Sequence, residues 1–583
     1  MKRLILVCIT LSLCLTFACS RPDRAADKSA VAASAPVQGD WGIIRLEGDV
    51  DNLNQIISTS AISSKVYFGA NFSFVGEMLM QYDPKDWSFS KPLLAEAPPE
   101  ISADHLTYTY TLRDGVKWHD GQPLTVNDFV FSAKAIMCPL VDGAPIRSTV
   151  SDLVNVEALE GRKIRYTMAR PNVMNGFFIG SLPFVPKHIY DPTGALDNLT
   201  IKDLLGPKGR TDPKVKDFAE KFNSNPANRT APGTGPYKFE KWDTGKEITL
   251  VRNPNYWGDQ KPYLDKIVFR IIRDQAPALT ALKAGEVDFN PRLAAVQYAE
   301  QTSGPTFDAQ FAKQTYTVPV YYYLLWNENR PWFKDKRVRQ ALTMLVDREQ
   351  IIKTIRFGLG KVATNVFPPS SPDFNPNIKP WPYDTKRAME LLDEAGWKDS
   401  NGDGVRDKGG VPFKFEFLAN SNSAYVDQLL PVLKESFRKA GIDMQERKID
   451  FTIFTETLRD QKYDAASSAW AMDLVSDPYQ ILHSSSAVNR GSNYGSFKNA
   501  EVDKLLEQAR QEFDSEKRKQ LYWTLQEIIH EEQPYTFVLW LEEAGAYTKR
   551  FQGVTFVPAR PGYDLNSWFV PRAAQKYTNV STN

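Results

Sequence analysis

The clearest indication of fold class is the segment FKFEFLANSNSAYVDQLLPVLKESFRKAGIDMQERKI, residues 413–449. It opens with FKFEFLA, which alternates apolar and charged residues as a strand does, and it closes with IDMQERKI, which reads as a second strand. Gly441 ends a predicted helix between them. The inward face of that helix consists of Val426, Leu429, Leu430, Leu433 and Phe437. Strand, helix and strand in this order predict a parallel crossover unit, and so an α/β fold.

Other segments show the same mixture of strand and helix signals. LTYTYTL, residues 106–112, alternates apolar residues with threonine, as a half-buried strand does. Thr125 and Asp128 form a capping box at the start of the next predicted helix. PYTFVLWLEE, residues 534–543, reads as a buried strand, and Asp347 caps a helix. Two further helix faces are predicted from Val338, Ala341, Leu342 and Leu345, and from Val502, Leu505, Leu506 and Ala509.

Length and charge narrow the class of protein. The chain has 583 residues, of which 42% are hydrophobic and 24% charged, so we expect a globular protein of two or three packed units. Its 71 basic and 70 acidic side chains leave a net charge of +1, and no block of one sign stands out. We therefore expect no nucleic-acid partner.

The N-terminus has the pattern of a secretion signal. Two basic residues precede an apolar run at 4–18, which is shorter than the roughly 20 residues that a membrane-spanning helix needs. The small residue before Cys19 resembles a bacterial lipoprotein cleavage box, in which Cys19 becomes the lipidated first residue. Thr16 and Phe17 depart from that box, and plain secretion is the alternative. We expect a signal peptide at 1–18.

Residues 19–40 are polar and small, and they predict a disordered tether. Cys8 and Cys14 would leave with the signal and Cys19 would be acylated, so Cys138 would be the remaining thiol. Folding should then rest on core burial without an intramolecular disulfide, with Cys138 as a small buried group.

The order and spacing of several longer segments match one known family. They are AEAPPEISADHLTYTYTLRDGVKWHDGQPLTVNDFVFS (95–132), GTGPYKFEKWDTGKEITLVRNPNYWGDQKPYLDKIVFRII (233–272), LKAGEVDF (282–289), YYYLLWNENRPWFKDKRVRQALTMLVDREQII (321–352), YDTKRAMELLDEAGW (383–397) and NAEVDKLLEQA (499–509). Nearly all of the chain after residue 45 resembles the family 5 extracellular solute-binding proteins of ABC transporters. That group contains dipeptide- and oligopeptide-binding proteins.

The resemblance implies a two-lobe periplasmic-binding-protein fold of type II, which closes by a hinge around its ligand. Lobe 1 would comprise residues 41–323 and 542–583, and lobe 2 residues 324–541. A further subdomain at 76–190 would be inserted in lobe 1. The two crossing strands would lie near YYYLLW and FVLWLEE.

The resemblance also implies a ligand anchor. In peptide-binding members, a tryptophan followed three positions later by an aspartate supplies the carboxylate that holds the peptide's α-ammonium group, and Trp470 and Asp473 have this spacing. We expect Asp473 to bind an ammonium group; the alternative is a loop or capping carboxylate. Trp470 would stack on the ligand or close the core. Asp477 precedes Pro478 and predicts a turn.

Four more residues are candidates for ligand contact. Tyr323, Trp326 and Asn327 surround the predicted hinge, and Tyr494 lies in GSNYGSF of lobe 2. Core packing is the alternative for the hinge residues.

Catalytic and cofactor patterns find little support in the sequence. The five histidines are scattered, HEEQP at 530–534 is not HExxH, and there is no GxSxG segment. WDTGKE lacks the glycine spacing of a phosphate-binding loop. We therefore expect no enzyme activity and no cofactor.

One loop has part of a calcium-binding pattern. DSNGDGVRDKGG, residues 399–410, places Asp399, Asn401, Asp403 and Asp407 at loop positions 1, 3, 5 and 9. Gly410 replaces the bidentate glutamate at position 12, and these residue types also form ordinary turns. A solvated loop is the preferred interpretation.

Together these features predict an extracytoplasmic lipoprotein, anchored through Cys19 and monomeric, that captures short peptides and delivers them to an ABC transporter permease. One alternative keeps the fold but changes the ligand to a nickel complex, haem, a sugar or an opine. A secreted hydrolase and a lipoprotein chaperone are more distant alternatives.

Overall fold

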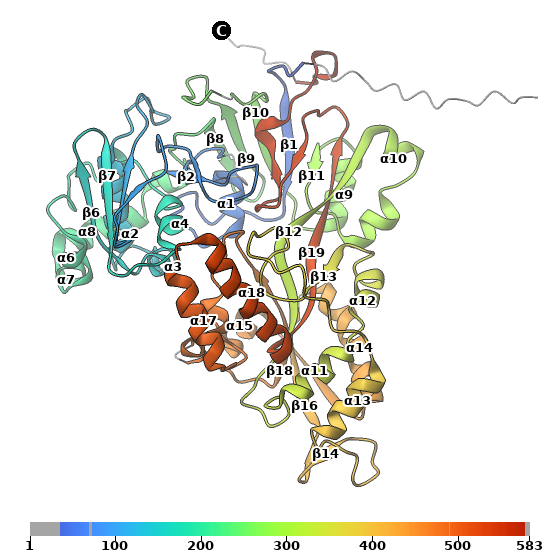
Figure 1. Cartoon of the computed structure of the whole chain (residues 1–583). Helices are drawn as coiled ribbons and strands as arrows, with labels where there is room; N and C mark the ends of the chain where they lie inside the picture. Colours follow the sequence, from blue (N-terminus) through green and yellow to red (C-terminus); the bar gives the residue numbers. More distant parts are fainter. Residues whose placement is uncertain (1–34, 69–72, 260, 422, 489, 578–583) are drawn as a thin grey trace, which may run out of the picture. The chain divides into compact units, whose positions relative to one another are not determined.

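A mixed sheet of eleven strands organises the chain (Figure 1). The structure is a computed structural model that describes residues 35–577 except 69–72, 260, 422 and 489. The strands follow one another in the order β17 (Asp443–Ile449), β16 (Lys414–Asn420), β18 (Ala465–Ala471), β12 (Phe311–Trp326), β19 (Tyr535–Thr548), β11 (Phe289–Asn290), β1 (Trp41–Leu46), β10 (Lys266–Ile271), β9 (Glu247–Arg252) and β8 (Tyr237–Asp243), with β13 (Gly360–Val362) beside β19.

The two long strands β12 and β19 join the two halves of this sheet. They pair antiparallel along their length, with a break in register between Thr317 and Tyr321. Beyond the break, β12 pairs with β18 from Val320 to Trp326, so this end belongs to the half that contains β16 and β17. The opposite end of β19 pairs with β11, which leads to β1 and β10.

The crossover unit predicted at 413–449 is confirmed. β16 and β17 pair in parallel over seven residues each, and α14 (Ala424–Lys439) connects them. Ser423 caps the helix by accepting a hydrogen bond from Val426 N–H. The helix buries Val426, Leu429, Leu430, Leu433 and Phe437, the face expected from their spacing.

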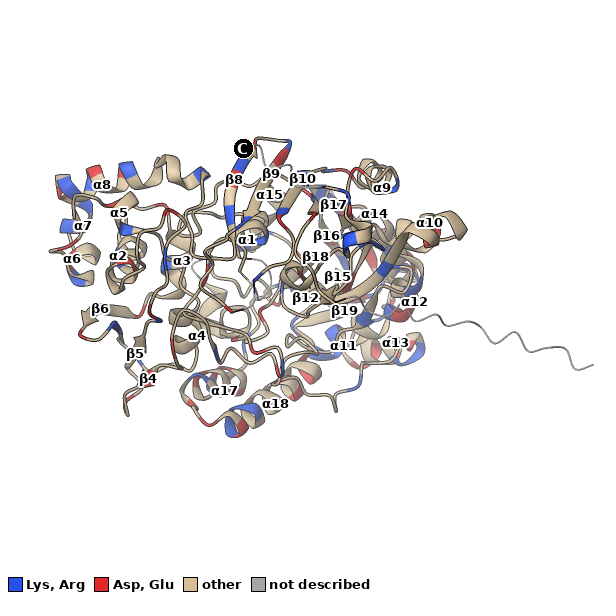
Figure 2. Ribbon diagram, turned by 90° about the horizontal axis from the view of Figure 1, so that it is seen from above, with Lys and Arg blue, Asp and Glu red and all other residues tan. Residues whose placement is uncertain are grey.

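Helices cover both faces of this half of the sheet, and the side chains of β12 alternate between them. Leu324 and Trp326 pack in a core with α11 (Lys336–Met344), α13 (Thr385–Glu394) and α14. Tyr323 and Leu325 pack on the opposite face with α15 (Phe451–Arg459), α17 (Ala500–Gln511) and α18 (Ser515–Glu532). Basic and acidic residues occur together along α17 and α18 (Figure 2). Asp347 caps α12 (Arg348–Thr354), as predicted.

A second, four-stranded sheet lies in the first third of the chain. Its strands follow the order β4 (Glu100–Ile101), β5 (Thr107–Thr111), β7 (Lys163–Met168) and β6 (Leu153–Leu159). The capping box is confirmed, because Thr125 N–H and Oγ1 both donate to Asp128 at the start of α2 (Val126–Met137). Cys138 is a free, buried thiol after that helix. Short helices complete this core: α3 (Ala144–Thr149), α4 (Asn175–Gly180), α5 (Lys187–Tyr190), α6 (Ile201–Leu205), α7 (Lys208–Thr211) and α8 (Pro213–Asn223).

Smaller elements surround the two sheets. They are α1 (Ala61–Tyr67), α9 (Gln275–Lys283), α10 (Pro305–Gln310), α16 (Tyr479–Leu482) and three hairpins: β2 (Met80–Gln81) with β3 (Lys91–Pro92), β14 (Asp407–Lys408) with β15 (Val411–Pro412), and β20 (Thr555–Phe556) with β21 (Tyr563–Asp564). The predicted signal peptide, Cys19 and residues 19–34 of the predicted tether lie outside the described residues. Within those residues, no helix combines the length and apolarity required to cross a membrane.

Candidate functional site

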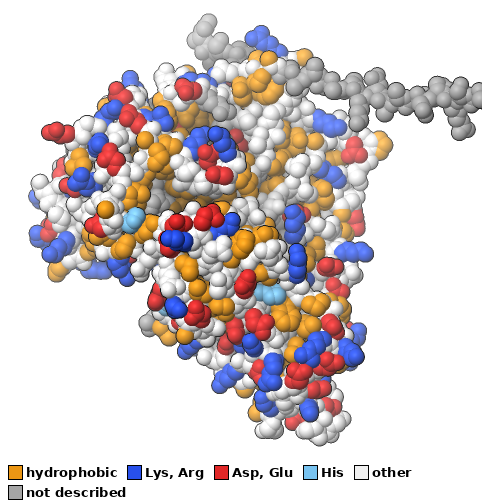
Figure 3. Space-filling view, in the orientation of Figure 1, with side chains coloured by type: hydrophobic (Ala, Val, Ile, Leu, Met, Phe, Trp, Pro, Cys, Tyr) orange, Lys and Arg blue, Asp and Glu red, His pale blue; other side chains and the backbone are white. Residues whose placement is uncertain are grey.

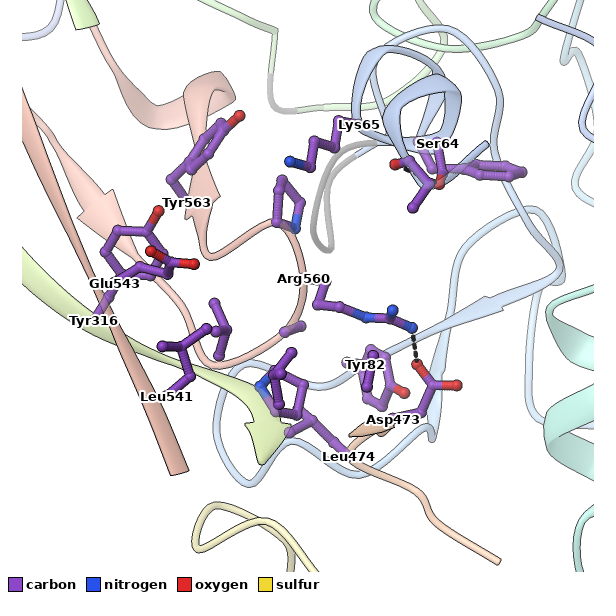
Figure 4. A pocket seen from close by; sticks show the side chains of 18 of the residues that line it. Ser64, Lys65, Tyr82, Tyr316, Asp473, Leu474, Leu541, Glu543, Arg560 and Tyr563 are labelled. Atoms are coloured by element: carbon purple, nitrogen blue, oxygen red, sulfur yellow. Dashed lines mark hydrogen bonds and ion pairs between the residues drawn. The ribbon is translucent and has the colours of Figure 1, made fainter. Parts of the chain in front are cut away.

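A cavity of about 410 Å³ lies beside the register break of β12 and β19. Its walls come from α1, from the segment 78–89 around β2, from α4, from the residues after β11 and from β12 at 318–322. The middle of β19, the residues after β18 and the turn between β20 and β21 complete them. We call it the charged cavity, because its lining contains Glu47, Lys65, Arg292, Asp473, Glu543 and Arg560. Figure 4 shows Asp473 and Glu543 on opposite sides of it.

These six charged side chains form three ion pairs. Arg560 Nη2 lies 3.0 Å from Asp473 Oδ1, and Arg292 Nε lies 2.9 Å from Glu543 Oε1. Lys65 pairs with Glu47. Three acids and three bases therefore line the cavity with no excess of either sign. The same mixing of signs is visible over the face of the molecule in Figure 3.

The pKa values of the two acids at the far side of the cavity, Glu543 and Glu47, are shifted in opposite directions, although burial acts to raise both. Burial raises the pKa of Glu543, and the attraction of Arg292 offsets this shift only in part. Burial also acts to raise the pKa of Glu47, but attraction to Lys65 and hydrogen bonding outweigh it and hold this pKa below its ordinary value. Glu543 in turn raises the pKa of Arg292. The Arg292–Glu543 and Lys65–Glu47 pairs are therefore part of the cavity wall.

A short turn after β18 places Asp473 in the cavity. Met472 N–H donates to the carbonyl of Pro319 at 2.7 Å, which fixes the chain against β12 as it leaves the sheet. Asp477 accepts a hydrogen bond from Tyr479 N–H at 3.0 Å and pairs with Arg510 at 2.6 Å. The carboxylate of Asp477 therefore holds the turn, as the sequence predicted, while Asp473 faces the cavity.

A second cavity, also of about 410 Å³, adjoins the same strands. The ladder between β16 and β18 reaches Leu418 and Ala466, and residues 467–470 beyond it line this cavity. Trp470 and Tyr494 stack on one wall, with ring centroids 5.6 Å apart and planes 17° apart. We call it the aromatic cavity, because the described residues that line it include no charged side chain but include Tyr322, Tyr323, Phe451, Phe454, Trp470 and Tyr494. Tyr322 lines both cavities.

Two of the residues predicted from the sequence lie at neither cavity. Trp326 is fully buried beside Phe333, and its Nε1–H donates to Thr536 Oγ1 at 3.2 Å. Asn327 is also buried, and its Nδ2 donates to the carbonyl of Tyr463 at 2.8 Å. Core packing accounts for both side chains, so the expectation of ligand contact is corrected for them.

The remaining predicted residues divide between the cavities. Asp473 lines the charged cavity, whereas Trp470, Tyr323 and Tyr494 line the aromatic one. Sequence reasoning missed the other five charged residues of the charged cavity. Glu543 had a usable signal, because a glutamate pair ends the buried strand PYTFVLWLEE. Nothing in the local sequence marked Arg560.

The carboxylates of the calcium-like loop are directed to the loop's own groups. Asp399 accepts hydrogen bonds from Gly402 N–H and Gly404 N–H at 2.7 and 3.0 Å. Asp407 accepts from Ser400 N–H and Oγ, and Asn401 donates to Asp403. Among the residues that the structure describes, no three His, Cys, Asp or Glu side chains come together in a way that would hold a metal ion.

The geometry defines a class of protein. A concave site with apolar walls, a few convergent charged groups and a position against the strands shared by two halves of a sheet is characteristic of small-ligand binding. Ligand binding between halves that two strands connect is the arrangement of a solute-binding protein.

Comparison with known proteins places the chain in one family. The family described as bacterial extracellular solute-binding proteins, family 5 Middle, matches residues 90–493. The oligopeptide-binding protein AppA of Bacillus subtilis is 30% identical over 563 residues, which cover 95% of this chain and 96% of the relative. This chain belongs to the family 5 extracellular solute-binding proteins, which confirms the resemblance.

Solved structures agree with this assignment. AppA of B. subtilis in complex with a nonapeptide has a TM-score of 0.71 at 29% identity, with 92% of this chain and 100% of that chain covered. NikZ of Campylobacter jejuni in complex with Ni(L-His) has a TM-score of 0.70 at 27% identity, with 91% and 99% covered. The fold is therefore common to relatives whose bound ligands differ.

Proposed function

We propose that this chain captures short peptides between its two cavities and delivers them to an ABC transporter permease. The observation that carries the proposal is the position of Asp473, which brings an accessible carboxylate into the charged cavity next to the turn after β18. The similarity to AppA, an oligopeptide-binding protein, supports peptides as the ligand class.

Asp473 is the proposed anchor of the peptide's α-ammonium group. Two unit charges about 4 Å apart attract each other by about 4 kcal/mol at an effective dielectric of about 20, before desolvation is subtracted. Asp473 is half exposed, so an incoming ammonium group can reach it without first opening the core. A fixed charge at one end of the ligand requires no particular side-chain sequence.

The aromatic cavity is the proposed site for peptide side chains. Aromatic rings and small hydroxyl side chains line it, so apolar groups can bury there while water completes the remaining volume. Trp470 lies in this cavity three residues before Asp473, so a peptide held at Asp473 would bring a nearby side chain toward the Trp470–Tyr494 stack.

Closure of two lobes is the proposed mechanism of capture. Lobe 1 would comprise residues 41–323 and 542–583, with the subdomain 76–190 inserted, and lobe 2 residues 324–541. The break in register between β12 and β19 supports a hinge here, because an interrupted ladder bends more easily than a continuous one. The ligand would stabilise the closed state by contacting both lobes.

Family membership supports a position outside the cytoplasm, and the apolar run at 4–18 followed by Cys19 supports export and a lipid anchor. We propose a monomer tethered by residues 19–40. A second candidate ligand is a metal–amino acid complex, because NikZ was solved with Ni(L-His). Neither His nor Cys is among the described residues that line the charged cavity, which favours peptides.

Mass spectrometry of the small molecules that the purified protein releases on denaturation tests the proposal. The wild type should release a family of short peptides, and Asp473→Ala should release far fewer. Asp403→Ala is the matched control, because it removes an exposed carboxylate from a loop that lines neither cavity. A single non-peptide species would contradict the peptide assignment. Equal peptide content in the wild type and Asp473→Ala would remove Asp473 as the anchor.

A further inference from the structure

We propose that Arg560 is an internal substitute for the ligand's ammonium group: it occupies Asp473 until a ligand with a positive charge replaces it. The inference rests on the proposed function of Asp473 as the ammonium anchor. It makes Arg560 a specificity-determining residue, because a ligand without such a charge cannot take its place.

The contact between the two side chains carries the proposal. Arg560 Nη2 donates to Asp473 Oδ1 at 3.0 Å, and both residues line the charged cavity (Figure 4). They come from segments 87 residues apart in the chain, the turn after β18 and the turn between β20 and β21. The guanidinium group thus occupies the position in which the proposed ligand presents its own cation.

The turn that carries Arg560 is well fixed. Gly562 N–H donates to the carbonyl of Ala559 at 2.8 Å, and Val557 N–H donates to the carbonyl of Gly562 at 2.9 Å. Gly562 has φ of +104°, and a β-carbon there would overlap the ring of Tyr316. Tyr316 is in turn held by its hydroxyl, which donates to the carbonyl of Pro291 at 2.7 Å. The backbone therefore directs Arg560 over the cavity.

The three acids of the cavity differ in how easily a ligand can reach them. The side chain of Asp473 is 50% exposed, whereas Glu47 is 21% and Glu543 11% exposed. Arg560, the partner of Asp473, is itself 44% exposed. Of the three pairs, the Asp473–Arg560 pair is therefore the one that water and a ligand can open at the smallest cost in desolvation.

Replacement follows from the charges. An ammonium group that reaches Asp473 places a second cation beside the guanidinium group, and the two repel each other while sharing one carboxylate. A neutral ligand end brings no charge that compensates for the lost pair, so it leaves Arg560 in place. Exposed ion pairs contribute little net stability, which keeps the exchange reversible.

Isothermal titration calorimetry with penta-alanine and N-acetyl-penta-alanine tests the inference. The proteins are the unliganded wild type, Arg560→Gln, Asp473→Asn and the double variant. Arg560→Gln should bind penta-alanine about two- to fivefold more tightly than the wild type, the ratio that corresponds to one exposed ion pair. It should leave the affinity for the acetylated peptide unchanged, and it should have no effect in the Asp473→Asn background. Arg572→Gln is the control, because it removes an exposed arginine from the same C-terminal segment.

Weaker or unchanged binding of penta-alanine by Arg560→Gln would overturn the inference, and weaker binding would make Arg560 a direct ligand contact instead. An equal gain for both peptides would also overturn it, because the gain would then not depend on the ammonium group. Binding of neither peptide by any of the proteins would count against the proposed function itself, which separates the two failures. Circular dichroism of each variant establishes that it is folded.

Discussion

The two cavities have similar volumes and share Tyr322, yet their linings are opposite in kind. Among the residues that the structure describes, six charged side chains in three pairs line the charged cavity, and none lines the aromatic cavity. Paired charges specify the end of a ligand by its sign, and they do so at a fixed place. Aromatic walls stabilise any ligand group in proportion to the apolar area that it buries, and they do not require one particular shape. Under the proposed function, selection for a charged end and tolerance of varied side chains would reside in separate parts of one site.

The largest expected effect is the loss of the charge at Asp473. Asp473→Asn keeps the shape of the side chain but removes its charge, so the affinity for free-amino peptides should fall roughly ten- to a hundredfold, the range for a hydrogen bond to a charged group. Titration calorimetry measures the affinities of the wild type and Asp473→Asn. The acetylated peptide should bind both proteins equally. An equal loss of affinity for both peptides would mean that Asp473 does not recognise the ammonium group.

Filling the aromatic cavity should have the next largest effect. Ala469 is exposed and lines that cavity, so Ala469→Trp should occupy its volume. Burying one large apolar side chain contributes about 1.5–3 kcal/mol, so peptides rich in phenylalanine should lose roughly tenfold or more in affinity. Penta-alanine serves as the internal control in the same competition assay. An equal loss for penta-alanine would mean that the aromatic cavity does not receive side chains.

Removing one ring of the stack should act more weakly. Trp470→Ala deletes the partner of Tyr494 while leaving the carboxylate of Asp473 in place. Aromatic contacts contribute about 0.5–1.5 kcal/mol, so peptides with aromatic side chains should bind roughly two- to tenfold less tightly. Fluorescence titration with matched phenylalanine and alanine peptides measures the difference. No change for either peptide would assign Trp470 to core closure.

Added salt should produce the smallest effect on affinity. It should distinguish the contribution of the charged cavity from that of the aromatic cavity without a mutation. The Debye length shortens from about 10 Å at 0.1 M salt to about 3 Å at 1 M. Affinity for penta-alanine should fall about twofold over this range in sodium chloride, because its ammonium group is attracted to a half-exposed carboxylate. The acetylated peptide should show a smaller fall. A larger fall for the acetylated form would place the dominant charge elsewhere.

Local patterns were sufficient to predict most of the elements that support the site. The segment 413–449 folded as its periodicity indicated, because the spacing of Leu429, Leu433 and Phe437 is a property of the helix itself. The cap at Thr125 was equally local, since both partners stand within one turn. Family resemblance added Asp473, which the structure places in the charged cavity.

What the sequence did not reveal depends on contacts between distant segments. Trp326 and Tyr323 stand in one aromatic run, but they point to opposite faces of a sheet that helices cover on both sides. Burial on both faces removes the apolar–polar alternation that would distinguish a core residue from a cavity residue. Arg560 meets its partner 87 residues away, so no spacing rule applies to it.

The break in the ladder between β12 and β19 has a consequence for how binding is sensed. Val318, Pro319 and Val320 stand in that break, and the same three residues form part of the wall of the charged cavity. Pro319 has no N–H to donate to a neighbouring strand, so the sequence itself requires an interruption of the ladder here. A ligand that touches this wall touches the joint between the two halves of the sheet. Under the proposed closure, a ligand bound at this wall would therefore also bias the relative orientation of those halves.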